Sequence, residues 1–140
     1  MQTVNPYLLY EDCDAALDFL ARAFGFEEVL RYTGEGGYVN HAEMKVGAKG
    51  RIFMGDPGDQ YKSPKRLGQE TVGFYVEIEE DVDALCERAR KAGATIMEEP
   101  VDQEYGHRRF TAEDLEGHVW YFARPIKQVE SEEWGAKVAS

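Results

Sequence analysis

The chain has 140 residues, with 16 Lys and Arg against 27 Asp and Glu, so its net charge is −11. This acidity argues against a nucleic acid or an anionic membrane surface as the partner, because phosphate binding requires a basic surface. The length suits one domain with its own hydrophobic core, and no apolar run approaches the roughly 20 residues of a membrane span. The start of the chain lacks the pattern of a signal peptide, and Cys13 and Cys86 fit reduced thiols. We therefore expect a cytoplasmic protein with a small-molecule ligand.

The first half of the chain predicts a strand, a helix and three strands. Val4 to Tyr10 reads as a strand, and Pro6 suits its beginning. Asp12 or Asp14 can cap the following helix, whose apolar residues recur at helical spacing as far as Gly25. Three antiparallel strands are then expected, with a glycine-rich turn between the first two, at residues 26–32, 38–46 and 51–55.

The second half repeats this order. Thr71 to Ile78 predicts a strand, Asp81 opens a second helix, Gly93 ends it, and Ala94 to Glu98 predicts another strand. When the two helices are superposed, Gly93 matches Gly25, and almost half of the chain separates the two glycines. The two remaining strands lie in the last hairpin, so the pattern predicts an α+β fold built from a duplicated βαβββ unit.

The last hairpin, Tyr105 to Arg124, has two unlike faces. Its strands flank an acidic turn that ends at Gly117, a residue free to adopt positive φ. Strand alternation places Trp120 and Phe122 on an apolar face suited to a core. It places a polar and aromatic set on the other face, suited to the wall of a pocket: His107, Arg109, Thr111 and Tyr121.

This hairpin resembles the last hairpin of the vicinal oxygen chelate superfamily, which includes glyoxalase I, bleomycin-resistance proteins and extradiol dioxygenases. The matching motifs are Tyr105-Gly106, Arg109-Phe110, the turn from Asp114 to Gly117, and Trp120, with Leu115 in place of the usual proline. With the repeated order of elements, the resemblance spans residues 4–125. A ferredoxin-like domain is the alternative, and it has one fewer strand in each half.

The resemblance implies two βαβββ modules that form a curved mixed-sheet cup with helices on its outer face. The single domain would cover residues 1–125, with modules at about 1–56 and 71–125, a linker at 57–70 and a C-terminal tail at 126–140. The linker contains prolines and glycines and is expected to lack regular structure, as a solvated connection rather than a ligand lid. The tail is expected either to dock as a short helix or to fray. A homodimer is implied as well, because the family often pairs its modules between chains.

Enzymes of this superfamily generally hold one divalent metal with His, Glu or Gln side chains. The corresponding positions fall on Asn5, Phe53, Thr71 and Tyr121, so we expect neither a metal nor another cofactor. The rival metal set is His41, Glu43 and His107. It would support the alternative function, a metal-dependent lyase, isomerase or dioxygenase. His118, whose parity on the strand is opposite to that of Tyr121, is expected to be a turn residue rather than a ligand.

The leading prediction is a non-metal small-molecule-binding protein that sequesters an aromatic or antibiotic-like ligand. Aromatic walls with a few polar groups are typical of such sites. One alternative is that these aromatic residues only fill the cup, and another is that the chain is a regulatory partner domain. The predicted ligand-binding residues are Tyr7, Leu9, His41, Phe53, Tyr75, His107, Arg109, Thr111 and Tyr121.

Overall fold

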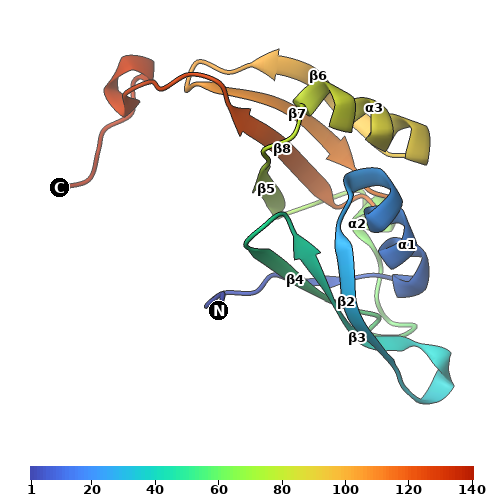
Figure 1. Cartoon of the computed structure of the whole chain (residues 1–140). Helices are drawn as coiled ribbons and strands as arrows, with labels where there is room; N and C mark the ends of the chain where they lie inside the picture. The colour runs from blue at the N-terminus through green and yellow to red at the C-terminus, as the bar shows by residue number, and fades with distance from the viewer.

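The computed structural model describes all 140 residues, and its strands form two four-stranded mixed sheets (Figure 1). The first sheet has the strand order β1-β4-β3-β2, and the second has the order β5-β8-β7-β6. In each sheet the first strand runs parallel to its neighbour and the other pairs are antiparallel. The first module contains β1 (Tyr7–Leu9), α1 (Cys13–Phe24), β2 (Glu27–Thr33), β3 (Val39–Val46) and β4 (Gly50–Gly55). The second contains β5 (Gly73–Glu77), α3 (Val82–Ala92), β6 (Thr95–Asp102), β7 (His107–Glu113) and β8 (Val119–Pro125).

Both long helices begin and end at the residues that the sequence pattern indicated. The Asp12 carboxylate accepts a hydrogen bond from the Ala15 N–H, and Asp81 does the same for Ala84, each at 3.0 Å. Gly25 and Gly93 terminate the helices in the left-handed conformation, with φ of 76° and 105°. The two glycines therefore mark equivalent positions of a true structural repeat.

Several predicted strand limits were wrong. The strand expected over residues 4–10 is only Tyr7–Leu9. Before it, the side-chain amide of Gln2, rather than a strand backbone, forms the hydrogen bonds with the backbone N–H and carbonyl of Arg51 in β4. The strand expected over 94–98 extends to Asp102, since its partner β7 pairs along that whole length. Between β2 and β3 the glycine-rich turn forms a short 3₁₀ helix, η1 (Glu35–Gly37).

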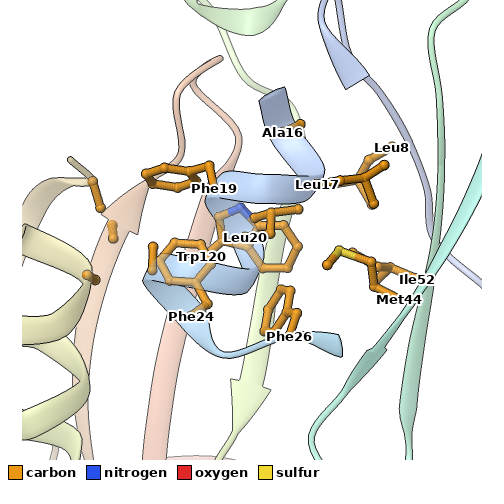
Figure 2. Close-up of a cluster of buried hydrophobic side chains, with 14 of the residues drawn as sticks. Leu8, Ala16, Leu17, Phe19, Leu20, Phe24, Phe26, Met44, Ile52 and Trp120 are labelled. Atoms are coloured by element: carbon orange, nitrogen blue, oxygen red, sulfur yellow. The ribbon is translucent and has the colours of Figure 1, made fainter. Parts of the chain in front are cut away.

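Helix α1 lies between the two sheets and joins both modules into one core. Figure 2 shows Leu17 directed toward Leu8 of the first sheet, while Phe24 lies beside Trp120 of the second. The ring centroids of Phe24 and Phe122 are 4.6 Å apart, and those of Phe26 and Trp120 are 5.3 Å apart. A single cluster of 24 buried residues includes side chains from both sheets and from α1 and α3. The two helices also pack on each other, so each sheet has one face in this shared core.

The linker is largely exposed, as expected, but the expectation that it lacks regular structure was wrong. It contains one helical turn, α2 (Pro64–Leu67), and hydrogen bonds attach it to both modules. The Tyr61 hydroxyl donates to the Leu9 carbonyl at 2.9 Å, and the Lys65 N–H donates to the Glu116 carbonyl at 2.9 Å. The first contact ties a linker side chain to β1, and the second satisfies a backbone N–H of the linker, so both hold this proline- and glycine-rich stretch in place.

The C-terminal tail docks through a short 3₁₀ helix, η2 (Ser131–Trp134), whose Trp134 ring lies 6.0 Å from that of Tyr105. The Ile126 N–H donates to the Gly106 carbonyl at 2.8 Å. A Cβ atom at position 106 would lie 2.1 Å from the Lys127 carbonyl oxygen, so glycine is required where the tail crosses the β6–β7 loop. None of the helices is both long and apolar enough to cross a membrane.

Candidate functional site

Each sheet has a core face, which packs on the helices, and an opposite face that we call its pocket face. On β3, Ala42 and Met44 are fully buried in the core, so His41 and Glu43 lie on the pocket face. On β8, Trp120 and Phe122 are fully buried, whereas Tyr121 between them is partly exposed. The parity predicted for the last hairpin is confirmed.

A chain of hydrogen-bonded side chains runs across the pocket face of the first sheet. The Tyr7 hydroxyl lies 2.9 Å from His41 Nδ1, and His41 Nε2 lies 2.9 Å from Glu43 Oε2. The other carboxylate oxygen of Glu43 accepts a hydrogen bond from Arg51 at 3.2 Å. The Phe53 ring packs edge-on against both Tyr7 and His41. Partial burial, and secondarily the nearby Cys13, raises the pKa of Tyr7, so this hydroxyl stays protonated at neutral pH.

The pocket face of the second sheet carries a similar arrangement. The Tyr75 hydroxyl lies 2.8 Å from His107 Nδ1 and 2.9 Å from the Tyr105 hydroxyl. Burial is the main reason that the pKa of Tyr75 is raised, followed by the hydrogen bond with Tyr105.

Arg109 lies beside this group and has several partners. It donates to the Tyr105 hydroxyl at 3.1 Å and to Glu98 at 3.0 Å. Its guanidinium lies 5.2 Å from the centre of the Tyr121 ring, a cation–π contact. Tyr105 and Glu98 were missed in the sequence. Tyr105 could have been found from its position two residues before His107, because residues two apart on an extended chain lie on the same side. Glu98 could not, because it lies on the neighbouring strand β6, whose pairing with β7 shifts register on both sides of it.

The aromatic pairs of the two networks occupy equivalent places in the repeat. Tyr7 is directly opposite Phe53, and Tyr75 is directly opposite Tyr121. The spacing along the chain from Tyr7 to Tyr75 equals that from Phe53 to Tyr121, and it equals that from Gly25 to Gly93. In each module the tyrosine of the first strand contacts the Nδ1 atom of a histidine. The duplication therefore preserves the aromatic pair. The two histidines are not equivalent, because His41 corresponds in the repeat to Arg109 rather than to His107.

The predicted ligand-binding residues are divided between these two faces. Tyr7, Leu9, His41 and Phe53 belong to the first sheet. The remaining residues belong to the second sheet: Tyr75, His107, Arg109, Thr111 and Tyr121. Tyr7 is 48% exposed and Tyr75 is 45% exposed, and β1 and β5 are edge strands that do not pair with each other. One chain therefore presents two open pocket faces. Thr111 is almost fully buried and is the least accessible of the set.

The residues at the family's metal positions do not fit a divalent metal. Asn5 precedes β1 and its amide donates to the Gln2 carbonyl, and Thr71 precedes β5. Phe53 and Tyr121 supply neither a carboxylate nor an imidazole.

The rival set is not assembled within one chain either. His41 and Glu43 are hydrogen-bonded to each other on the first sheet, and His107 lies on the second. The one cluster of three metal-ligating atoms is Cys86, Glu87 and Glu99, on α3 and β6. Arg90 already forms ion pairs with both of those glutamates, at 3.3 and 2.5 Å.

A hollow of about 820 Å³ lies where β1 meets the linker and the start of β5. His118 is one of its lining residues, with Nε2 2.9 Å from the Leu9 carbonyl oxygen and Nδ1 3.3 Å from Glu70 Oε2. It lies at the end of the last turn, where it directly precedes β8. Its imidazole is almost fully buried and connects β1, the linker and the last hairpin.

Known proteins are similar to this chain in sequence, in fold or in both. The model of the Glyoxalase/Bleomycin resistance protein/Dioxygenase superfamily matches residues 3–122. Uncharacterized proteins of Mycobacterium bovis and Mycobacterium tuberculosis are 30% identical over 98% of this chain, covering 92% and 82% of their own lengths. The crystal structure of TioX from Micromonospora sp. ML1 is 32% identical, with a TM-score of 0.72 over 90% of this chain and 100% of that chain. A glyoxalase I mutant from Zea mays shares the fold, with a TM-score of 0.70 at 18% identity over 89% of this chain and 47% of that chain.

The family match covers most of the chain, and the duplicated βαβββ architecture agrees with it. The chain belongs to the Glyoxalase/Bleomycin resistance protein/Dioxygenase superfamily.

Proposed function

We propose that this protein binds an aromatic small molecule on its pocket faces, without a metal ion, and sequesters it. One observation carries the proposal. Each sheet face that the helices leave uncovered presents aromatic rings beside polar groups already held by hydrogen bonds. Small-molecule sites have this composition, with apolar walls and a few oriented polar groups. The superfamily includes bleomycin-resistance proteins beside enzymes, so a binding role has a precedent within it.

The side chains that would touch the ligand are preorganised. Arg109 is held by Tyr105 and Glu98, so its guanidinium loses little further entropy when it orients a polar group of the ligand. Tyr121 and Phe53 offer flat apolar surfaces on their respective sheets. Hydrogen bonding of His41 to both Tyr7 and Glu43 directs its nitrogens to protein partners rather than to a metal.

The proposed site is complete only in a homodimer. Each chain leaves both pocket faces open, and the shared core prevents those faces from closing on each other. Pairing the first sheet of one copy with the second sheet of another would enclose a ligand between aromatic walls. The edge strands β1 and β5 are available for such pairing, since an edge strand readily accepts another chain. Both cysteines are buried and free, which suits the cytoplasm in which we place the protein.

The test is native mass spectrometry of protein purified without chelator, together with a small-molecule binding screen. The variants Phe53→Ala and Tyr121→Ala should lose the bound compound while remaining folded. Tyr38→Ala is the matched control, because this exposed tyrosine precedes β3 and instead bonds to Asp59. A ligand that both variants retain would contradict the proposed site.

Elemental analysis of the same preparation tests the metal-free binding mode. We expect no stoichiometric transition metal. Stoichiometric metal that disappears in His41→Ala or Glu43→Ala would instead establish the metal-dependent alternative.

A further inference from the structure

Three basic side chains gather where β3 turns into β4. Lys45 and Arg51 are direct cross-strand partners on the pocket face, and Lys49 belongs to the connecting turn. Like charges placed directly opposite each other destabilise an antiparallel pair. Arg51 reaches away to Glu43, but no carboxylate forms an ion pair with Lys45 or Lys49. Glu27, the β2 partner of Lys45, does not come within ion-pair distance either. Glu43 therefore offsets the charge of Arg51, whereas the charges of Lys45 and Lys49 have no carboxylate partner.

These cations line a hollow of about 760 Å³ that continues the pocket face of the first sheet. Phe53 forms its apolar side. Its opposite wall is the N-terminal segment, where Gln2 exchanges two hydrogen bonds with the Arg51 backbone, at 2.8 and 2.9 Å. None of the nine lining residues is acidic, in a chain with 27 acidic residues and 16 basic ones.

The second module shows that the fold does not require these charges. At the place equivalent to Lys45 and Arg51, Glu113 is opposite Val119 in the ladder between β7 and β8. The turn that follows Glu113 contains Asp114 and Glu116 and is acidic. At the equivalent pair and in its turn, the second module therefore carries neither lysine nor arginine, so this part of the hairpin can form without them.

The net charge of −11 does not cancel the local field. Salt screens charges beyond roughly 8 Å at physiological ionic strength, so a group inside the hollow responds to the side chains around it. Lys45 and Lys49 have no ion-pair partner and are free to bind an anion.

We infer that this hollow binds the anionic oxygen group of the ligand, a carboxylate or phosphate, while the aromatic part of the ligand packs on Phe53. The inference rests on the proposed function and specifies its ligand class as an aromatic anion. Lysine suits this role as a point charge that an oxyanion can approach from several directions.

The test compares two probes of nearly equal shape, 2-naphthoate and its neutral counterpart 2-naphthamide, by isothermal titration calorimetry. The wild-type protein should bind 2-naphthoate more tightly, with an advantage that shrinks as salt is added. Lys45→Gln and Lys49→Gln should each weaken 2-naphthoate by about fivefold and leave 2-naphthamide unchanged. Lys45→Arg should retain the affinity, and Lys91→Gln, on the surface of α3, is the control that should change nothing. Phe53→Ala should weaken both probes.

Two results separate the inference from the proposed function. Equal affinities for the two probes, or unchanged 2-naphthoate binding in both glutamine variants, would overturn the anion site and leave the proposed pocket intact. If neither probe binds, the ligand class is wrong. The proposed function is then decided by the purified protein. A bound compound that is lost in Phe53→Ala and Tyr121→Ala supports it, and a compound that both variants retain contradicts it.

Discussion

The Asp114 carboxylate accepts a hydrogen bond from the Tyr10 hydroxyl at 2.7 Å, although 104 residues separate them in the chain. The same carboxylate accepts from the Trp120 indole at 3.1 Å and from the backbone N–H groups of Glu116 and His118. Asp114 is only 5% exposed, so one buried charge joins the end of β1, the last turn and β8. Burial, and then the Asp114 charge, raises the pKa of Tyr10 well above its ordinary value and keeps it a donor.

Asp114→Ala should therefore lower the free energy of unfolding by about 3 kcal/mol, because four donors lose their acceptor at once and a buried donor without a partner costs about 1–3 kcal/mol. Urea denaturation measures the effect. Glu80→Ala, at an exposed acidic residue in the loop before α3, is the control and should change stability by less than about 0.5 kcal/mol. Similar midpoints for both variants would refute the structural role of Asp114.

Two adjacent residues of β8 should separate stability from binding. Trp120 is fully buried among Phe24, Phe26 and Phe74, so Trp120→Ala should cost on the order of 3–5 kcal/mol. Tyr121 lies on the pocket face, so Tyr121→Ala should cost little stability and should weaken ligand binding. Thermal midpoints beside a ligand titration distinguish the two. The opposite pattern would mean that the pocket face has been assigned to the wrong side of the sheet.

The proposed site requires a homodimer, because a single chain leaves Tyr7 and Tyr75 about half exposed on separate sheets. Sedimentation equilibrium at micromolar concentration should show a species of twice the chain mass of 15.9 kDa. A charged substitution at the β1 edge, Leu9→Lys, should shift the protein toward monomer and reduce ligand binding together. A wild-type protein that sediments as a monomer at every concentration would exclude the composite site.

Protonation of Glu11 in acid should weaken the attachment of the linker to the first module. Hydrogen bonds from Ser63, and then from Arg66, lower the pKa of Glu11 from its ordinary 4.5 to about 2. Because the folded-state pKa lies below the unfolded one, ionised Glu11 stabilises the folded protein fully above about pH 4.5. This contribution is lost as the pH falls through about 2. The partly buried Glu116 contributes with the opposite sign, since burial raises its pKa and its ionisation opposes folding at neutral pH.

The stability difference between wild type and Glu11→Gln should therefore be largest at neutral pH and should shrink across this acidic range. Urea midpoints along a pH series provide the measurement, with Glu80→Gln as a control that should follow the wild type throughout. A difference that stays constant with pH would show that the carboxylate charge is not the source of the effect.

Local patterns determined much of this protein from the sequence alone. Asp12 and Asp81 mark the starts of the two long helices, and Gly25 and Gly93 mark their ends. These signals can be read from the sequence because a cap interacts with backbone groups only a few residues away. Strand alternation correctly placed Trp120 in the core and Tyr121 on the opposite face, because the side-chain period of a strand is two. The internal repeat followed from the order of such elements.

Contacts between distant segments were decided only by the tertiary structure. The linker was expected to lack regular structure, yet it contains the turn α2, and its Lys65 N–H donates to the Glu116 carbonyl of the last turn. No local sequence pattern predicts that the Tyr7 hydroxyl contacts His41 or that α1 packs between the two sheets. Those facts depend on how two independently patterned modules bury their apolar faces against the same helices, and this packing leaves both pocket faces uncovered within the chain.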